Sequence, residues 1–236
     1  MSFYRDFSAV YERIFPVRDS TVRFLNSRLG EAPGRVLDAG CGPGHLLARL
    51  PLIGHVGIDL DPEMIARGRD LHRDLDLRVL DLRRVGELDL VFDAAVCLGN
   101  VLPHLDRIDV AGFLGTLHHC LAPGATWVVQ TVNFDRLQGR ETWSFPVLEI
   151  DDFRFERRYV GLDGSGCRFL TRLLRDGETL FEGDVAMTAL TTDEFLDRHR
   201  AAGFDLVSME ADFAGTPFEP AASPGRVAVF RRDLTA

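Results

Sequence analysis

The 236-residue chain contains no lysine, so all 27 of its basic side chains other than histidine are arginine. This absence excludes enzymes that use a Schiff-base lysine, and it excludes nucleotidases whose phosphate-binding loop requires a lysine. No run of about 18 apolar residues is present, so we expect no membrane-spanning helix. The first ten residues lack the basic and then apolar layout of a secretory signal, and we therefore expect a cytoplasmic protein.

Cysteine is scarce and has no metal-binding spacing. The four cysteines, Cys41, Cys97, Cys120 and Cys167, form no CxxC pair, so we expect reduced, mostly buried thiols and no metal site. The formal net charge is −9, and no basic run is interleaved with aromatic residues. Because an acidic surface repels phosphate backbones, we expect no nucleic-acid partner.

Apolar runs alternate with helical patterns over the first 132 residues, which predicts an α/β fold with a doubly wound parallel sheet. Asp61 followed by Pro62 is typical of a helix start, and Asp19 or Ser20 could cap the first helix. The expected helices span residues 19–29, 43–50, 62–71 and 110–121, and the expected strands span residues 35–38, 55–59, 77–80, 90–98 and 125–132.

The pattern changes after residue 132. About four strand-like runs follow, at residues 147–150, 153–160, 167–175 and 179–189, with Asp-Gly turns between them. We interpret residues 133–190 as an inserted antiparallel β lid over the substrate. Residues 1–132 and 191–236 would form the core, with residues 1–30 as an N-terminal helical cover. Within the core, Thr191 to Glu194 predict a helix start, and residues 204–213 and 226–231 predict a final pair of strands.

A glycine-rich turn follows the first expected strand in the run VLDAGCGPG, which contains Gly40, Gly42 and Gly44. Glycine lets the backbone turn sharply and approach a ligand closely, and the next helix would present free N–H groups. A dinucleotide site usually has its third glycine three residues after the second, whereas one residue separates them here. Asp38 precedes the first glycine by two residues, which disfavours a diphosphate and favours an ammonium or sulfonium group.

Acidic residues also end the next two strands. Asp59 lies about twenty residues after the glycines, at the spacing of an acid that accepts ribose hydroxyls, which would also suit NAD. Asp81 could accept from an adenine amino group, while Leu60 and Met64 could flank the ring; core packing is the alternative for Met64. The segment from Leu98 to Asn100 ends the fourth strand, where an open sheet places its ligand cleft.

The runs VLDAGCGPGH, GIDLDPEM, VLDLR and CLGNVLPHL resemble the motif series of class I S-adenosylmethionine-dependent methyltransferases over about residues 35–132. The runs YERIFP, VVQTVNFDR, FERRY and DFAGTPFEPAASP are similar to the glycine N-methyltransferase-like branch of small-molecule enzymes. This resemblance implies a Rossmann-like, mostly parallel seven-stranded sheet with an antiparallel terminal strand. It also implies S-adenosylmethionine as cofactor, S-adenosylhomocysteine as product, and a small-molecule substrate that is methylated on nitrogen or oxygen.

The resemblance also implies a set of cofactor-binding residues. The glycines would line the methionine part of the cofactor, Asp38 would approach its amino end, and Asp59 would hold the ribose. Asp81 and Leu82 would meet the adenine, and Tyr11 would cover the cofactor. The full set is Tyr11, Asp38, Gly40, Cys41, Gly42, Gly44, Asp59, Leu60, Met64, Asp81, Leu82, Leu98, Gly99 and Asn100.

Candidate substrate and catalytic residues follow the fourth and fifth strands. His104 could take a proton from an amine or hydroxyl, or it could shape its loop through a structural hydrogen bond. Asn133 and Arg136 are candidates for substrate contact, with a turn and cap at the exit to the insertion as the alternative. Phe213 and Phe218 could wall the pocket.

Three other functions stay open at this point. The chain could bind S-adenosylmethionine without transferring its methyl group. It could methylate nucleic acid or protein, although an Asn-Pro-Pro-aromatic motif and a glutamate pair are both missing after the fourth strand. It could also be a nicotinamide reductase, which the short glycine spacing disfavours.

Overall fold

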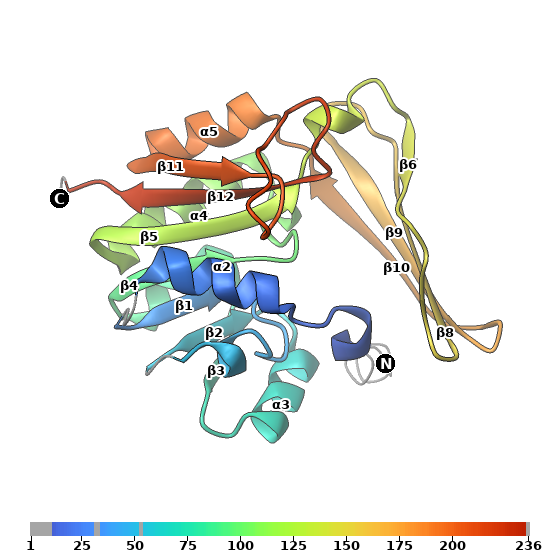
Figure 1. Cartoon of the computed structure of the whole chain (residues 1–236), viewed down its shortest axis with the longest axis horizontal. Helices are drawn as coiled ribbons and strands as arrows, with labels where there is room; N and C mark the ends of the chain where they lie inside the picture. The colour runs from blue at the N-terminus through green and yellow to red at the C-terminus, as the bar shows by residue number, and fades with distance from the viewer. Residues whose placement is uncertain (1–10, 31–33, 52–53, 235–236) are drawn as a thin grey trace.

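The computed structural model describes residues 11–30, 34–51 and 54–234, and within them seven strands form the main sheet (Figure 1). The strand order is β11-β12-β5-β4-β1-β2-β3. Strands β1 to β5 run parallel, whereas β12 is antiparallel to both of its neighbours, as expected for the terminal strand. The bounds are β1 Val36–Ala39, β2 Val56–Asp59, β3 Asp76–Val79, β4 Phe92–Cys97, β5 Leu121–Val132, β11 Phe204–Glu210 and β12 Gly225–Arg232.

Helices cover both faces of this sheet, because successive strand side chains point to opposite sides. Val36 of β1 joins the apolar cluster of Phe24 and Leu25, whereas its neighbour Leu37 joins the cluster of Leu114 and Phe195. Helices α2 (Asp19–Leu29) and α3 (Pro62–Leu71) therefore lie on one face, and α4 (Arg107–Cys120) and α5 (Thr192–Ala201) lie on the other. In the described part of the chain, no helix is both long enough and apolar enough to cross a membrane.

Short 3₁₀ helices connect several of these elements. They are η1 Leu47–Arg49, η2 Leu82–Leu88, η3 Leu102–His104 and η4 Asp135–Leu137. The helix expected over residues 43–50 was wrong, since η1 is its only helical part. The reason lies in the glycines: Gly42 and Gly44 have φ angles of +52° and +78°, in the left-handed region that a right-handed helix excludes.

The expected cap of α2 was also wrong. Arg18 is the capping residue, and its side chain makes no capping hydrogen bond. Asp19 instead pairs with Arg49, whose Nη2 donates to the carboxylate at 2.6 Å. The Asp19 carboxylate, which the sequence predicted as a possible cap of α2, is therefore used in a tertiary contact with η1. Of the N-terminal helical cover expected over residues 1–30, the part from Tyr11 is described and includes α2, whereas residues 1–10 lie outside the described residues.

A second, antiparallel sheet follows β5 in the chain. Its strands are β6 Thr142–Ser144, β7 Leu148–Ile150, β8 Phe153–Val160, β9 Gly166–Arg175 and β10 Glu178–Thr188. Their order is β10-β9-β8-β6, with β7 also paired to β8. Figure 1 shows this sheet beside the carboxyl ends of the parallel strands of the main sheet. The three-residue strand β6 was missed because it is too short to show an alternating pattern.

The start of α5 provides a measurable local contribution to stability. The Thr191 hydroxyl accepts from the backbone N–H of Glu194, and the Glu194 carboxylate accepts from the backbone N–H of Thr191. We expect Thr191→Ala to lower the free energy of unfolding by about 1 kcal/mol in urea denaturation, because one helix donor loses its partner. The matched variant Asp193→Ala removes only a first-turn charge, so its effect should be a few tenths of a kcal/mol. Equal effects of the two substitutions would contradict a specific cap.

Candidate functional site

The turn after β1 is held against the end of β2. The backbone N–H groups of Gly40 and Cys41 both donate to the carbonyl of Ile58, at 2.8 and 2.9 Å. Gly40 has a φ of +87°, and a Cβ at this position would lie 2.6 Å from both methyl groups of Val101. A side chain is therefore excluded at Gly40 both by the backbone conformation and by the space, and the turn brings bare backbone to the carboxyl end of the sheet.

Two carboxylates lie under this turn, at the ends of β1 and β2. The Asp59 carboxylate accepts from the backbone N–H groups of Gly42, at 2.8 Å, and Asp61, at 2.9 Å. Asp38 is almost fully buried. Burial, with a further contribution from Asp59, raises the pKa of Asp38 to about 7, and burial also raises the pKa of Asp59. Among the described residues, neither carboxylate has an ion-pair partner, so the site is acidic and suited to cationic or hydroxyl donors.

Tyr11 lies over the same turn. Its ring carbons are 3.9 Å from the place that a Cβ of Gly42 would occupy, and its ring packs on Phe15 with 5.4 Å between centroids. Burial raises the pKa of Tyr11 to about 12, with further contributions from Asp59 and Asp38. The phenol is therefore neutral near the two carboxylates and lies over the turn; that Tyr11 covers a bound cofactor stays a prediction.

The residues after β2 and β3 are placed differently from one another. Leu60 is exposed, with 64% of its surface accessible, whereas Met64 is buried in α3. Leu82 is also buried. The Asp81 carboxylate accepts from the backbone N–H of Arg83 and pairs with the Arg83 guanidinium, and this hydrogen bond lowers the pKa of Asp81. An adenine amino group at Asp81 would therefore compete with Arg83.

The end of β4 is tied to β5 and to the second sheet. Asn100 has a φ of +64°, and its amide oxygen accepts from the backbone N–H of Val132 at 2.8 Å. Its amide nitrogen donates to the Tyr159 hydroxyl of β8 at 3.1 Å. The backbone N–H of Gly99 donates to the Gln130 side chain at 2.7 Å. Gln130 and Tyr159 were not predicted here, although a glutamine inside the apolar run of β5 is a signal that sequence analysis could have used.

His104 lies in η3, next to β10, and is the candidate proton acceptor. Its surface is exposed in the structure, and partial desolvation by the surrounding protein lowers the pKa of His104. In the described ranges, no hydrogen bond to this ring is present, so the structural hydrogen bond considered as an alternative is not seen. A neutral imidazole with a free lone pair can accept a proton near neutral pH.

Asn133, expected to contact a substrate, is placed instead in the turn-and-cap role that the sequence analysis gave as the alternative. Its side chain is fully buried, and its amide nitrogen donates to the carbonyls of Pro220 and Ser223 at 2.7 and 2.8 Å. Its amide oxygen accepts from the backbone N–H of Asp135. Asn133 therefore fastens the loop between β11 and β12 and has no polar atom left for a ligand. Arg136 stacks on Trp143, with its guanidinium carbon 5.0 Å from the ring centroid.

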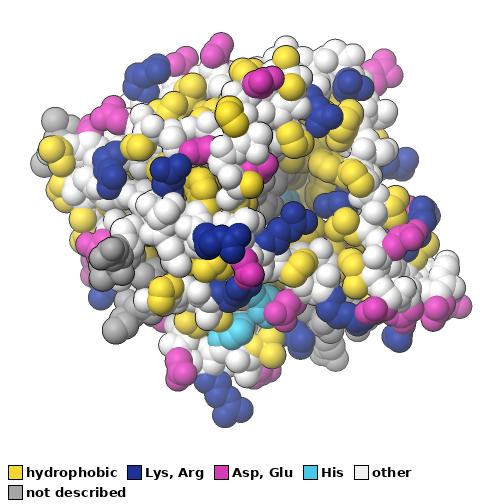
Figure 2. All heavy atoms as spheres, in the orientation of Figure 1, with side chains coloured by type: hydrophobic (Ala, Val, Ile, Leu, Met, Phe, Trp, Pro, Cys, Tyr) yellow, Lys and Arg dark blue, Asp and Glu magenta, His cyan; other side chains and the backbone are white. Residues whose placement is uncertain are grey.

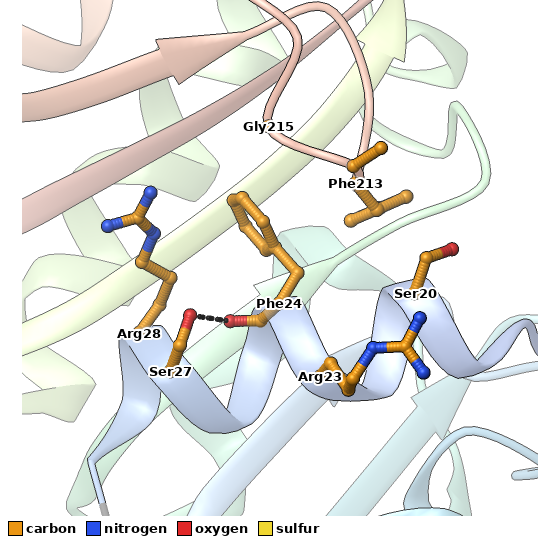
Figure 3. Close-up of a pocket in the computed structure, with 8 residues that line it drawn as sticks. Ser20, Arg23, Phe24, Ser27, Arg28, Phe213 and Gly215 are labelled. Atoms are coloured by element: carbon orange, nitrogen blue, oxygen red, sulfur yellow. Dashed lines mark hydrogen bonds between the residues drawn. The ribbon is translucent and has the colours of Figure 1, made fainter.

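Phe213 lines a groove of about 440 Å³ between α2 and the start of the loop after β11 (Figure 3). Its ring meets the edge of Phe24, with 5.6 Å between centroids. The groove is lined by Ser20, Arg23, Phe24, Ser27, Arg28, Phe213, Ala214 and Gly215, and it includes no residue of the predicted cofactor set. Phe218 is half-buried in the same loop, and a role of Phe213 and Phe218 in walling the substrate pocket stays a prediction.

The four cysteines are buried and unbonded, in agreement with the prediction of reduced thiols. In the described part of the chain, no group of three or more histidine, cysteine, aspartate and glutamate side chains is arranged to hold a metal ion.

Comparison with known proteins gives matches in sequence and in fold. Residues 36–124 match the family described as a methyltransferase domain. The ubiquinone biosynthesis O-methyltransferase of Xylella fastidiosa strain M23 is 35% identical over 126 residues, which are 50% of this chain and 48% of that protein. The trans-aconitate 2-methyltransferase of Methylobacterium nodulans is 36% identical over 106 residues, which are 42% of this chain and 38% of that protein. The chain therefore spans about half the length, or less, of these curated relatives.

Solved structures match over almost the whole chain. An S-adenosylmethionine-dependent methyltransferase from Clostridium acetobutylicum aligns with a TM-score of 0.83 at 15% identity, covering 98% of this chain and 99% of that chain. An S-adenosylmethionine-bound amino pentose methyltransferase from Micromonospora echinaspora aligns with a TM-score of 0.71 at 23% identity, covering 96% of both chains. These likenesses confirm the Rossmann-like fold predicted from the sequence.

Proposed function

We propose that the protein is an S-adenosylmethionine-dependent methyltransferase that methylates a nitrogen or oxygen atom of a small molecule, because residues 36–124 match the family described as a methyltransferase domain. The names of similar proteins favour this class, since they include an O-methyltransferase of ubiquinone biosynthesis, a trans-aconitate 2-methyltransferase and an amino pentose methyltransferase. The observation that carries the proposal is the pair of carboxylates beneath a turn of bare glycine backbone, the buried Asp38 and the half-buried Asp59.

The chemistry of these groups fits the cofactor. Asp38 can accept hydrogen bonds from the ammonium of its methionine part, and Asp59 from its ribose hydroxyls, because ionised carboxylates are strong acceptors. A diphosphate would add negative charge beside two buried acids, which disfavours a nicotinamide dinucleotide. Tyr11, as a neutral phenol over the turn, would exclude water from the bound cofactor.

When bound, S-adenosylmethionine supplies a methyl group whose carbon–sulfur bond breaks as the acceptor lone pair forms the new bond, and the sulfur leaves as a neutral thioether. The residues of the chain align the acceptor and exclude water. His104 would accept the acceptor's proton where the nucleophile arrives protonated, since its lowered pKa keeps the imidazole neutral. The second sheet, within the insertion of residues 133–190, would act as the lid over the acceptor.

The first experiment is a calorimetric titration of the purified chain with S-adenosylmethionine, S-adenosylhomocysteine and NADH. We expect the first two to bind and NADH not to bind. Asp59→Ala should weaken S-adenosylmethionine binding about 10- to 100-fold, because a charged hydrogen bond contributes about 1.5–3 kcal/mol. The matched control is Asp76→Ala. It removes an exposed carboxylate at the first residue of β3, far from the strand ends that carry Asp38 and Asp59.

Each outcome separates the alternatives. A folded chain that does not bind S-adenosylmethionine would overturn the proposed function. Binding without transfer of an isotope-labelled methyl group to any amine, phenol or carboxylic acid in a broad panel would favour a catalytically silent cofactor-binding protein. Equal losses in Asp59→Ala and Asp76→Ala would contradict the proposed site while leaving cofactor binding in place.

A further inference from the structure

Strand β8 presents an alternating row of side chains to the core. Phe155 meets the ring of Phe15, with 5.8 Å between centroids, and Tyr159 meets Asn100 at the end of β4. Arg157 lies between Phe155 and Tyr159 in this row, so its side chain is on the same face of the sheet. In Figure 2 this side of the molecule is hollowed between the main and second sheets, with basic side chains at the rim.

Arg157 and Arg158 are the arginines of the second sheet for which no ion pair is seen among the described residues, and of these two only Arg157 is partly buried. Arg154, Arg168, Arg172 and Arg175 each pair with a carboxylate, at distances of 2.6 to 2.8 Å. Arg157 has no such partner among the described residues. Its Nη2 donates to the carbonyl of Pro146 at 3.1 Å, and its Nε is buried without a hydrogen-bond partner. The guanidinium therefore keeps donor capacity and an unneutralised charge on the inner face.

Aromatic rings hold this guanidinium in place. The rings of Phe15, Phe145 and Phe155 surround it, with centroids 5.7, 5.3 and 5.6 Å from its central carbon. Rings stabilise a cation, but they leave its in-plane N–H groups without acceptors. Burial lowers the pKa of Arg157, yet arginine remains charged at neutral pH. A half-buried cation in this state is a preorganised receptor for an anion.

We propose that Arg157 binds a carboxylate group of the methyl acceptor and thereby selects carboxylate-bearing small molecules. The planar guanidinium fork matches a planar carboxylate through two parallel hydrogen bonds. Thr171 lies directly opposite Arg157 on β9, which places a hydroxyl donor beside the fork. A single guanidinium balances one negative charge, which favours a carboxylate monoanion over a phosphate dianion. This inference rests on the proposed methyltransferase function.

The test compares acceptors that differ only in the anionic group. Methyl transfer to 3,4-dihydroxybenzoate, glycine and anthranilate is measured beside transfer to their amides, with catechol monophosphate as the phosphate probe. In parallel, thermal shift with S-adenosylhomocysteine present measures binding of the same compounds without turnover. We expect the acids to be preferred over their amides about 10-fold or more in transfer or in binding. Equal treatment of acids and amides, binding of none of the acids, or a preference for the phosphate would overturn the assignment.

Variants identify the residue responsible. Arg157→Gln should lower kcat/KM for the preferred acid about 10- to 100-fold, chiefly through KM, and should leave the amide nearly unchanged. Arg157→Lys keeps the charge but not the planar fork, so its kcat/KM for the preferred acid should lie between the values of wild type and Arg157→Gln. Arg158→Gln is the matched control. Arg158 is exposed and, as the next residue along the strand, its side chain lies on the face opposite to that of Arg157. A loss in Arg157→Gln that is equal for acid and amide would show a structural role only.

Cofactor binding separates this inference from the function on which it rests. Calorimetric titration of wild type and Arg157→Gln with S-adenosylmethionine should give the same affinity, because Arg157 contacts neither Asp38 nor Asp59. If wild type fails to bind the cofactor, the proposed function fails. If wild type binds and transfers without any preference for acids, only the role of Arg157 fails.

Discussion

Asp38→Asn is expected to weaken S-adenosylmethionine binding about 10- to 100-fold, because the cofactor's ammonium loses a charged acceptor. The same substitution should stabilise the unliganded protein at alkaline pH. Burial and the nearby Asp59 raise the pKa of Asp38 to about 7, so the wild-type carboxylate is ionised and buried above that pH. Asparagine has a similar shape and carries no charge at any pH.

The direction of the pH effect follows from the folded and unfolded pKa values. An unfolded aspartate has a pKa of about 3.9, below the folded value, so the unfolded state releases its proton first as the pH rises. The stability that wild type gains from the protonated Asp38 is therefore complete below about pH 4 and is lost as the pH rises through 7. Relative to wild type, Asp38→Asn should gain about 2–3 kcal/mol between pH 5 and pH 8.

Two measurements check this expectation. Urea denaturation at pH 5 and pH 8 gives the stability difference, with Asp76→Asn as a control whose difference should not change between these pH values. Calorimetry at pH 7 in buffers of different ionisation enthalpy should show proton release when wild type binds S-adenosylmethionine, because the bound ammonium lowers the pKa of Asp38. Asp38→Asn should release no such proton. A variant that binds as tightly as wild type would remove Asp38 from the cofactor site.

Gly40→Ala is expected to destabilise the protein by about 2–4 kcal/mol and to abolish measurable cofactor binding. The new Cβ would lie 2.6 Å from both methyl groups of Val101, and the backbone would be strained at a φ of +87°. Either the turn or the residue after Asn100 must shift to accommodate it. Both movements displace groups at the carboxyl ends of β1 and β4.

A double-mutant cycle separates overlap from backbone strain. Val101→Ala in the Gly40→Ala background should restore part of the lost stability, because it removes both overlapping methyl groups. Gly30→Ala measures the strain alone, since Gly30 has a φ of +89° and no atom within 4 Å of its added Cβ. We expect that control to cost about 1–2 kcal/mol and to leave cofactor binding intact. Additive effects of Gly40→Ala and Val101→Ala would contradict the overlap.

Local rules were enough for the features whose partners lie nearby in sequence. Asp61 caps α3 through the backbone N–H groups of Glu63 and Met64, two and three residues away, and the sequence predicted this helix with its observed bounds. Alternating apolar runs likewise predicted most of the strands within one or two residues. Asp59 could be placed at the end of a strand because strand ends and glycine spacing are also local properties.

Residues with distant partners could not be placed in this way. Asn133 follows β5 in the sequence, where a substrate-binding residue could lie. The carbonyls that accept hydrogen bonds from its amide belong to residues 87 and 90 positions later in the chain. Asn100 looked like a ligand for the cofactor, but its amide is used by β5 and β8. Arg157 could not be singled out from the sequence, because two of the three rings around it, Phe15 and Phe145, lie outside its own strand.

The two hydrogen bonds of Asn100 connect the end of β4 to β5 and to the second sheet. One amide group links the strand end beside the glycine turn to Tyr159 of the second sheet, and Arg157 is two residues from Tyr159. A displacement of β8 that breaks the Tyr159 bond removes one restraint on Asn100 and so alters the rigidity of the strand end. Under the proposed function, Asn100 would therefore connect the cofactor site to the acceptor site, and by thermodynamic reciprocity any affinity that one ligand gained from the other would be gained equally by the other.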